Sequence, residues 1–247
     1  MMEFLNELQS AAFWIGLWQI ILVNIVLSGD NAVVIALAAR SLPPKQQKKA
    51  VFWGAGAAVV MRIILTIVAV ELLRLPWLKF IGAALLLWIA IKLLVPEDGG
   101  DDGIESSDNL WAAIKTILIA DLVMSLDNVI AVAAAAKGSI VLLVLGLAIS
   151  IPLVVFGATM LMKIMDRYPI IITIGAALLG WVAGDMAATD PVVRGWVDAN
   201  AAWLHWAAPA AGAIFVVAVG RWLAARAEAA QKEVVDLGEG SESGAPR

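Results

Sequence analysis

The sequence contains no cysteine and a single histidine, His205, among its 247 residues. The lack of cysteine excludes disulfides, thiolate metal centres and cysteine nucleophiles, and one histidine cannot build a multi-histidine metal site. Any cation that this chain binds must therefore be held by oxygen atoms. Oxygen ligands favour magnesium, calcium or manganese over copper or zinc.

Charged residues are also scarce. They make up 15% of the chain, whereas hydrophobic residues make up 62% and the mean hydropathy is +0.90. Soluble domains carry about 25% charged residues, so this chain has too few polar side chains to coat a soluble globule. The net charge of −4 offers no basic surface for nucleic acid. We expect an all-helical membrane protein, with no enzymatic active site and no resident cofactor.

Apolar stretches long enough to cross a bilayer recur along the chain, since a span needs about 20 mostly apolar residues. The sequence predicts seven transmembrane helices, near 11–39, 50–73, 76–95, 110–136, 139–163, 169–188 and 203–223. The N-terminal residues lack the basic region of a signal peptide, so the first stretch is interpreted as a retained helix.

The basic residues between the spans predict the orientation. One side of the membrane receives 12 of them, Arg40, Lys45, Lys48, Lys49, Lys92, Lys115, Lys163, Arg167, Arg221, Arg226, Lys232 and Arg247. The other side receives 4, Arg74, Lys79, Lys137 and Arg194. By the positive-inside rule the first side is cytoplasmic, and the N-terminus lies outside. An even number of spans is the alternative. We expect an acidic cytoplasmic loop at 96–109 and a disordered cytoplasmic tail at 227–247.

The chain contains an internal repeat. Residues 27–39 align with 124–136 at an offset of 97, and both segments contain a Ser-x-Asp-Asn motif. Residues 81–90 align with 174–183 at an offset of 93, with eight identities in ten positions. The repeat predicts one three-helix unit at 1–95, a second at 110–190 and an extra helix at 203–226. Because three spans are an odd number, the two units must have opposite topology, which is the inverted repeat typical of secondary transporters.

Polar residues interrupt the first span of each unit. A carboxylate in lipid costs several kcal/mol and therefore needs a partner or a water-filled cavity. The candidate ligands of a cation are Asp30, Asn31, Asp121, Asp127, Asn128, Asn24, Ser28 and Ser125. Their carboxylate, amide and hydroxyl oxygens suit a dehydrated divalent cation at mid-membrane depth. The alternative is that these side chains only cross-link helices by hydrogen bonds.

Two further residues bear on this site. Asn24, Ser28 and Asn31 share one face of a regular helix, and Asp30 lies about 100° away from that face. Unwinding of the helix at Gly29 would turn Asp30 toward the same face. Arg62, in the middle of the second span, has no basic counterpart in the second unit. We expect it to pair with Asp30, Asp121 or Asp127 when the site is empty and to be displaced by a cation. The alternatives are a permanent structural ion pair and a side chain that reaches the interface from a shifted span.

These residues carry a resemblance. The segments Leu-Ser-Gly-Asp-Asn-Ala-Val-Val-Ile-Ala at 27–36 and Ala-Asp-Leu-Val-Met-Ser-Leu-Asp-Asn-Val at 120–129 resemble the TerC family of integral membrane proteins, in particular its YjbE-like branch. The resemblance covers the first six spans. It implies an exporter of cations, chiefly manganese, with Asp30, Asn31, Asp121, Asp127 and Asn128 at the polar positions. Position 24 is often acidic in the family, whereas it is Asn24 here.

The sequence therefore predicts a multi-pass protein of the bacterial inner membrane that exports a divalent cation, with manganese favoured. It would work by alternating access around the Asp/Asn site, with membrane lipid and the metal ion as expected partners. Two alternatives remain. One is an exporter of a small organic cation such as a basic amino acid, although no aromatic wall surrounds Asp30 or Asp127. The other is a membrane scaffold that transports nothing.

Overall fold

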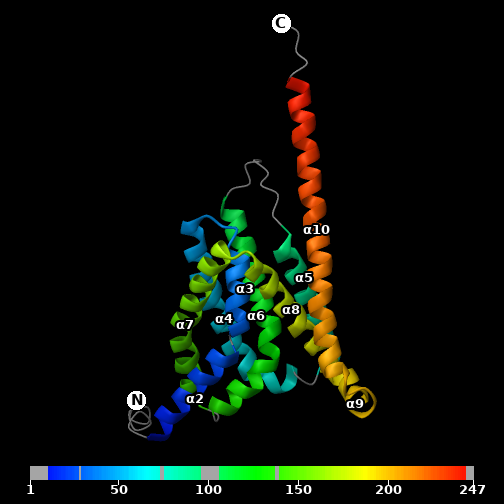
Figure 1. The fold of residues 1–247 in the computed structure, drawn as a ribbon. Coiled ribbons are helices and arrows are strands. Elements are labelled where there is room, and N and C mark those ends of the chain that lie inside the picture. Colours follow the sequence, from blue (N-terminus) through cyan, green and yellow to red (C-terminus); the bar gives the residue numbers. More distant parts are fainter. Residues whose placement is uncertain (1–10, 28, 73–74, 96–105, 137–138, 243–247) are drawn as a thin grey trace.

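The computed structural model describes residues 11–27, 29–72, 75–95, 106–136 and 139–242, and within these ranges it contains nine α-helices and no strand (Figure 1). The helices are α2 (Ala11–Leu27), α3 (Gly29–Ala39), α4 (Pro44–Leu72), α5 (Leu78–Leu94), α6 (Ser106–Ala136), α7 (Ile140–Arg167), α8 (Ile170–Ala188), α9 (Pro191–Asn200) and α10 (Leu204–Glu242). The predicted all-helical class is confirmed.

The outer surface of the bundle is apolar. Large side chains such as Trp18, Phe156 and Ile214 are 61%, 69% and 70% exposed. A soluble protein rarely exposes so much contiguous apolar surface, whereas a bilayer solvates it. The interior is built from small and aliphatic residues such as Ala36 and Leu86, which are fully buried. The protein is a multi-pass membrane protein.

Five of the described helices are long and apolar enough to cross a membrane by themselves, namely α4, α6, α7, α8 and α10. A sixth span arises if α2 and α3 are counted together, because they form a pair bent by 50°. The predicted span at 76–95 is occupied by α5, which has 17 residues and is therefore about 25 Å long. That length is slightly less than a hydrocarbon core of about 30 Å, so the seventh span stays a prediction.

The bend divides the first predicted span where the sequence placed a possible unwinding point. Helix α2 ends at Leu27 and α3 begins at Gly29. Glycine favours such a break because it costs a helix interior more than other residues do. The break creates two helix ends inside the bundle, and both belong to the segment that carries Asn24, Asp30 and Asn31.

Helices α8 and α10 approach each other through glycine. A Cβ atom on Gly180 would lie 2.4 Å from the Gly212 carbonyl oxygen, and one on Gly184 would lie 2.1 Å from the Ala208 oxygen. Gly180 and Gly184 thus form a small-xxx-small contact surface, and Ala208 and Gly212 form the matching one. This contact fixes α10 against the rest of the bundle.

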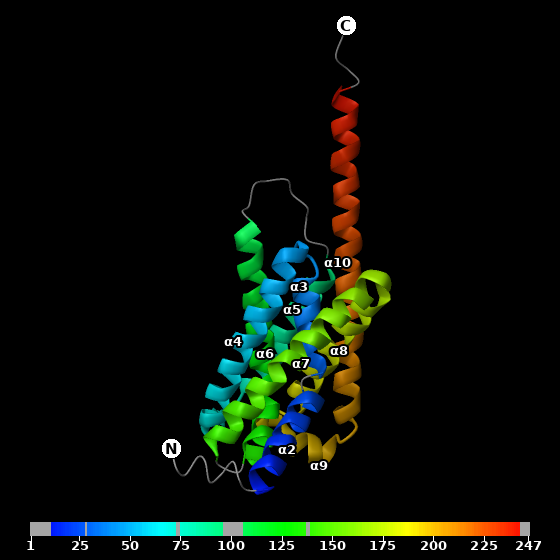
Figure 2. The same cartoon turned by 90° about the vertical axis from the view of Figure 1, so that its left-hand side faces the viewer.

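Two predicted boundaries differ from the structure. Helix α6 already begins at Ser106, inside the predicted loop 96–109, while residues 96–105 lie outside the described residues. Helix α10 runs without a break through the predicted start of the tail at 227 and ends at Glu242. Both views show this part projecting beyond the bundle (Figures 1 and 2). The segment 223–235 is rich in Ala, Glu, Gln and Lys, which are strong helix formers and account for the continuous helix.

Candidate functional site

Arg62 is the centre of a buried polar cluster. Its Nη2 lies 2.6 Å from Asp121 Oδ1 on α6, its Nη1 donates to Asn24 Oδ1 on α2 at 2.6 Å, and its Nε donates to Ser125 Oγ at 3.0 Å. Arg62 is only 3% exposed. A buried guanidinium is tolerated only where its donors and its charge are compensated, and here helices α2 and α6 supply that compensation.

A second layer of hydrogen bonds holds these partners in place. Ser125 Oγ donates to Asp121 Oδ2 at 3.2 Å, one turn away on α6. Asn24 Nδ2 donates to Ser150 Oγ on α7, and Ser150 Oγ in turn donates to the Leu147 carbonyl at 2.8 Å. We refer to Asn24, Arg62, Asp121, Ser125 and Ser150 together as the polar cluster.

Sequence reasoning missed Ser150. The residue is fully buried and connects α7 to the cluster, which otherwise involves only α2, α4 and α6. Its signal in the sequence was weak, one small hydroxyl in the middle of an apolar span, two positions before Pro152. Thr66, whose hydroxyl donates to the Arg62 carbonyl at 2.7 Å, was missed for the same reason: serine and threonine also satisfy themselves within their own helix.

Among the described residues, the side chain of Asn31 has no hydrogen-bonding partner. It is 2% exposed, yet neither its Oδ1 nor its Nδ2 has a partner. It lines a cavity of about 20 Å³ together with Asn24, Arg62 and Asp121. A polar cavity of about that size holds one water molecule. We call this space the inner cavity. Buried amides are almost always hydrogen-bonded, so Asn31 is suited to a small occupant that offers it a contact.

Asp30 lies at the helix break, next in the chain to Asn31, which lines the inner cavity. Its Oδ1 accepts from the Asn31 backbone N–H at 2.9 Å, in the first turn of α3. Its side chain is partly buried and is close enough to Arg62 and Asp121 for their charges to interact. The break therefore places a second carboxylate near Asp121. The C-terminal end of a helix carries partial negative charge, and Asp30 follows the end of α2 at Leu27.

The remaining predicted ligands are less well placed by the structure. Ser28 and the side chain of Asp127 lie outside the described residues. Asn128 is partly buried on α6. Among the described residues, no group of three or more histidines, cysteines and acids gathers closely enough to hold a metal ion. The structure thus assembles Asn24, Asp121, Ser125 and Arg62, sets Asn31 and Asp30 beside them, and leaves the full ligand set a prediction.

The arrangement has a definite charge balance. Arg62 and Asp121 neutralise each other, and Asp30 is a second carboxylate close enough for its charge to interact with theirs. A cation that enters must compete with the Arg62 guanidinium for Asp121, because both need the same oxygens. The cluster is therefore chemically able to exchange a tethered cation for a free one.

Comparison with known proteins agrees with the architecture. The integral membrane protein TerC family matches residues 9–228. The membrane protein YjbE of Bacillus subtilis is 44% identical over 178 residues, which cover 72% of this chain and 81% of YjbE. YceF of the same organism is 28% identical, over 70% of this chain and 71% of YceF. The Escherichia coli UPF0053 protein YegH is 26% identical over 68% of this chain, a match that covers 35% of YegH.

No solved structure matches the chain. The family match covers the helices that carry both aspartate-asparagine motifs and the polar cluster. It also covers helices α2 to α9 and the membrane-crossing part of α10. The chain therefore belongs to the TerC family of integral membrane proteins.

Proposed function

We propose that this chain exports divalent metal cations, Mn²⁺ foremost, by alternating access around the polar cluster and the inner cavity. The observation that carries the proposal is the side chain of Asn31, which is buried at the helix break without a hydrogen-bonding partner. If Asn31 only cross-linked helices, both polar atoms of its side chain would have hydrogen-bonding partners. If it binds the cation, those atoms are expected to lack partners while the site is empty.

The proposed cycle uses Arg62 as an internal substitute for the cargo. In the empty state the Arg62 guanidinium forms an ion pair with the Asp121 carboxylate. An incoming cation takes the Asp121 carboxylate and the Asn24 and Asn31 oxygens, and Arg62 withdraws. Asp30 and Asp121 then balance the two positive charges of the ion, and Asp127 and Asn128 complete the oxygen ligands that the family resemblance implies. In the empty state Arg62 balances the charge of Asp121, and the bound cation takes over that role in the loaded state, so Asp121 keeps a counter-ion in the apolar interior throughout.

The proposal includes seven spans, two inverted repeats and an N-terminus outside. Helix packing supports this arrangement. Helix α4 packs on α6, while its repeat mate α7 packs on α2 and α3, the mates of α6. Helix α5 packs on its own mate α8. A two-fold axis in the membrane plane requires this exchange of partners, and it puts the shared site at the contact between the units.

The size of the inner cavity favours a metal ion over the organic-cation alternative. A space of about 20 Å³ accepts one water-sized occupant and not a basic amino acid. The scaffold alternative gives no reason for an open amide beside two carboxylates. It requires that all polar contacts in the cluster be structural, which the experiment below separates from transport.

The test is Mn²⁺ efflux from proteoliposomes and cell-associated metal measured element by element. Asp30→Asn removes one charge but keeps an oxygen for the Asn31 N–H. We expect it to lower the apparent Mn²⁺ affinity at least about tenfold, the loss that even a supporting residue of a metal site causes. The matched control is Asp198→Asn on α9, an exposed aspartate paired with Arg194 and His205, which should transport normally.

Three outcomes are informative. Lost efflux in a folded Asp30→Asn protein supports the proposal. Unchanged efflux in Asp30→Asn and Asn31→Ala would refute it. Inhibition of Mn²⁺ efflux by lysine, with transport of lysine itself, would favour the organic-cation alternative instead.

A further inference from the structure

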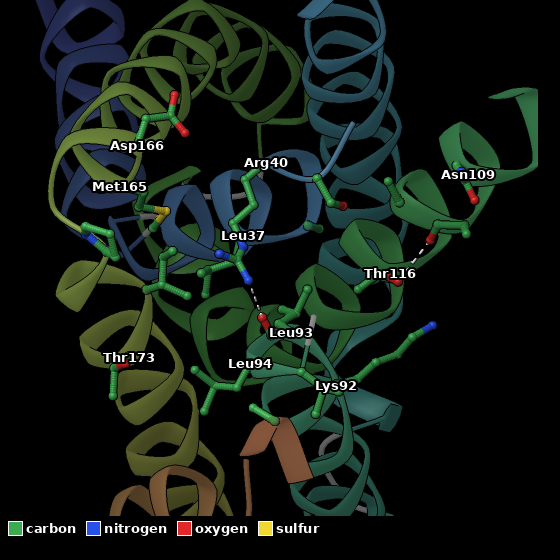
Figure 3. A pocket seen from close by; sticks show the side chains of 18 of the residues that line it. Leu37, Arg40, Lys92, Leu93, Leu94, Asn109, Thr116, Met165, Asp166 and Thr173 are labelled. Carbon is green, nitrogen blue, oxygen red and sulfur yellow. Dashed lines mark hydrogen bonds between the residues drawn. The ribbon is translucent and has the colours of Figure 1, made fainter. Parts of the chain in front are cut away.

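A second, larger pocket opens at one end of the bundle and has no part in the proposed cation site. Its volume is about 660 Å³. It is bounded by the ends of α3 and α5, the start of α6, the connection between α7 and α8, and the middle of α10 (Figure 3). We call it the basic pocket.

The charges that line the basic pocket are mostly positive. Arg40 follows α3, Lys92 lies in the last turn of α5 and Arg221 lies on α10, while Asp166 is the only acid in the lining among the residues that the structure describes. Arg40 Nη2 donates to the Leu93 carbonyl at 2.9 Å, which holds the guanidinium among the lining side chains (Figure 3). Three basic residues from three separate segments suit a ligand with concentrated negative charge, such as a phosphate group.

The rest of the lining is amphipathic. Ser41, Asn109, Thr116 and Thr173 provide hydroxyl and amide groups, and Leu37, Leu94, Met165 and Ile172 provide apolar surface. A small inorganic anion would leave that apolar surface bare. A ligand with a charged head and an apolar continuation would use both kinds of surface.

Aromatic residues indicate the depth of the pocket in the membrane. Trp88 and Trp222 are 58% and 57% exposed on α5 and α10, which pack together. The Lys92 ammonium lies 5.8 Å from the Trp88 ring centre, and the Arg226 guanidinium lies 4.9 Å from that of Trp222. Exposed tryptophans with adjacent basic residues are typical of the headgroup level of a bilayer. Lys92 and Arg221 therefore lie at the depth of lipid phosphates.

We propose that the basic pocket is a binding site for the phosphate headgroup of an anionic phospholipid. Basic pockets between transmembrane helices at headgroup depth bind such lipids. Arg40, Lys92 and Arg221 would contact the phosphate, and the leucine and isoleucine surface would contact the start of the acyl chains. This proposal is independent of the cation site.

The test uses the full chain, purified in detergent and reconstituted into nanodiscs of phosphatidylcholine with or without phosphatidylglycerol. Native mass spectrometry counts the retained lipid, and a titration gives its affinity. Lys92→Gln and Arg221→Gln should each weaken phosphatidylglycerol binding about fivefold, and the double variant about thirtyfold, from the usual contribution of one basic residue near a lipid surface. Arg40 is left unchanged because it also donates to Leu93.

The matched controls are Lys115→Gln on α6 and Arg226→Gln on α10, two exposed basic residues outside the pocket lining. Their binding should stay within twofold of the unaltered chain, roughly the scatter of a surface effect. Equal losses in pocket and control variants would overturn the proposal, because the attraction would then be diffuse. Displacement of phosphatidylglycerol by glycerol phosphate at similar concentration would overturn it in favour of a soluble phosphate compound.

Discussion

Arg62 on α4 and Asp121 on α6 form a buried ion pair, with 2.6 Å between Nη2 and Oδ1 and with both side chains less than 10% exposed. In such surroundings the two charges depend on each other, because neither has water to solvate it. The pair therefore affects the stability of the bundle and, in the proposed cycle, the access of a cation to Asp121.

Removing one member of this pair should destabilise the protein strongly, whereas removing both members should destabilise it much less. Arg62→Met or Asp121→Leu alone is expected to lower the free energy of unfolding by about 3–5 kcal/mol, because the remaining charge stays buried without its counter-ion. The double variant should lose clearly less free energy of unfolding than the sum of the losses in the two single variants. Chemical unfolding of the detergent-solubilised chain measures the coupling; the exposed pair Arg194 and Asp198 is the control and should contribute at most about 1 kcal/mol.

Two buried asparagines should behave oppositely. Asn24→Ala removes partners from Arg62 and Ser150, and we expect a loss of about 1–3 kcal/mol of stability because buried groups lose their hydrogen bonds. Asn31→Ala removes an amide without a partner, so stability should be unchanged or slightly higher. Thermal unfolding measures both. A large destabilisation by Asn31→Ala would mean that Asn31 is structural, contrary to its proposed role as a ligand.

The glycine contact between α8 and α10 should tolerate no side chain. Gly184→Ala places a Cβ 2.1 Å from the Ala208 carbonyl oxygen, and overpacking of this kind costs about 1–3 kcal/mol. Gly195→Ala in α9, where nothing lies within 4 Å of the new atom, should instead stabilise the chain by about 0.5–1 kcal/mol through helix propensity. Melting temperatures of the two variants should shift in opposite directions.

Asp190 joins two helices by capping both. Its Oδ1 accepts from the Val192 N–H of α9 at 2.9 Å, and its Oδ2 accepts from the Lys79 and Phe80 N–H groups of α5 at 3.1 and 3.3 Å. Asp190→Ala should lower the free energy of unfolding by about 1–2 kcal/mol or more, the upper part of the range for the loss of a single helix cap. Asp190→Asn, which retains one acceptor oxygen, should cost less. Equal losses for the two variants would show that charge, and not capping, is what matters there.

The candidate site could be predicted in part. Asp30, Asp121, Asn24 and Arg62 stood out because polar residues are rare in an apolar helix and must have partners. The repeated Ser-x-Asp-Asn motif included Ser125, and Gly29 indicated the possible break in the first span. Ser150 could not be found this way, because a hydroxyl can bond to its own helix and leaves no periodic signal. Asp190 was missed because its second role depends on α5, which is more than a hundred residues away in the chain.

The sequence by itself determined that this is a helical membrane protein, because a chain with 62% hydrophobic and 15% charged residues cannot be solvated by water and must satisfy its backbone within helices. It also determined which residues are too polar for their spans. Only the tertiary structure decided that Arg62 forms its ion pair with Asp121, since the sequence offered three aspartates as equally suitable partners. Helix propensity and hydropathy are local properties, whereas the choice among buried partners depends on which helices pack together and at what depth.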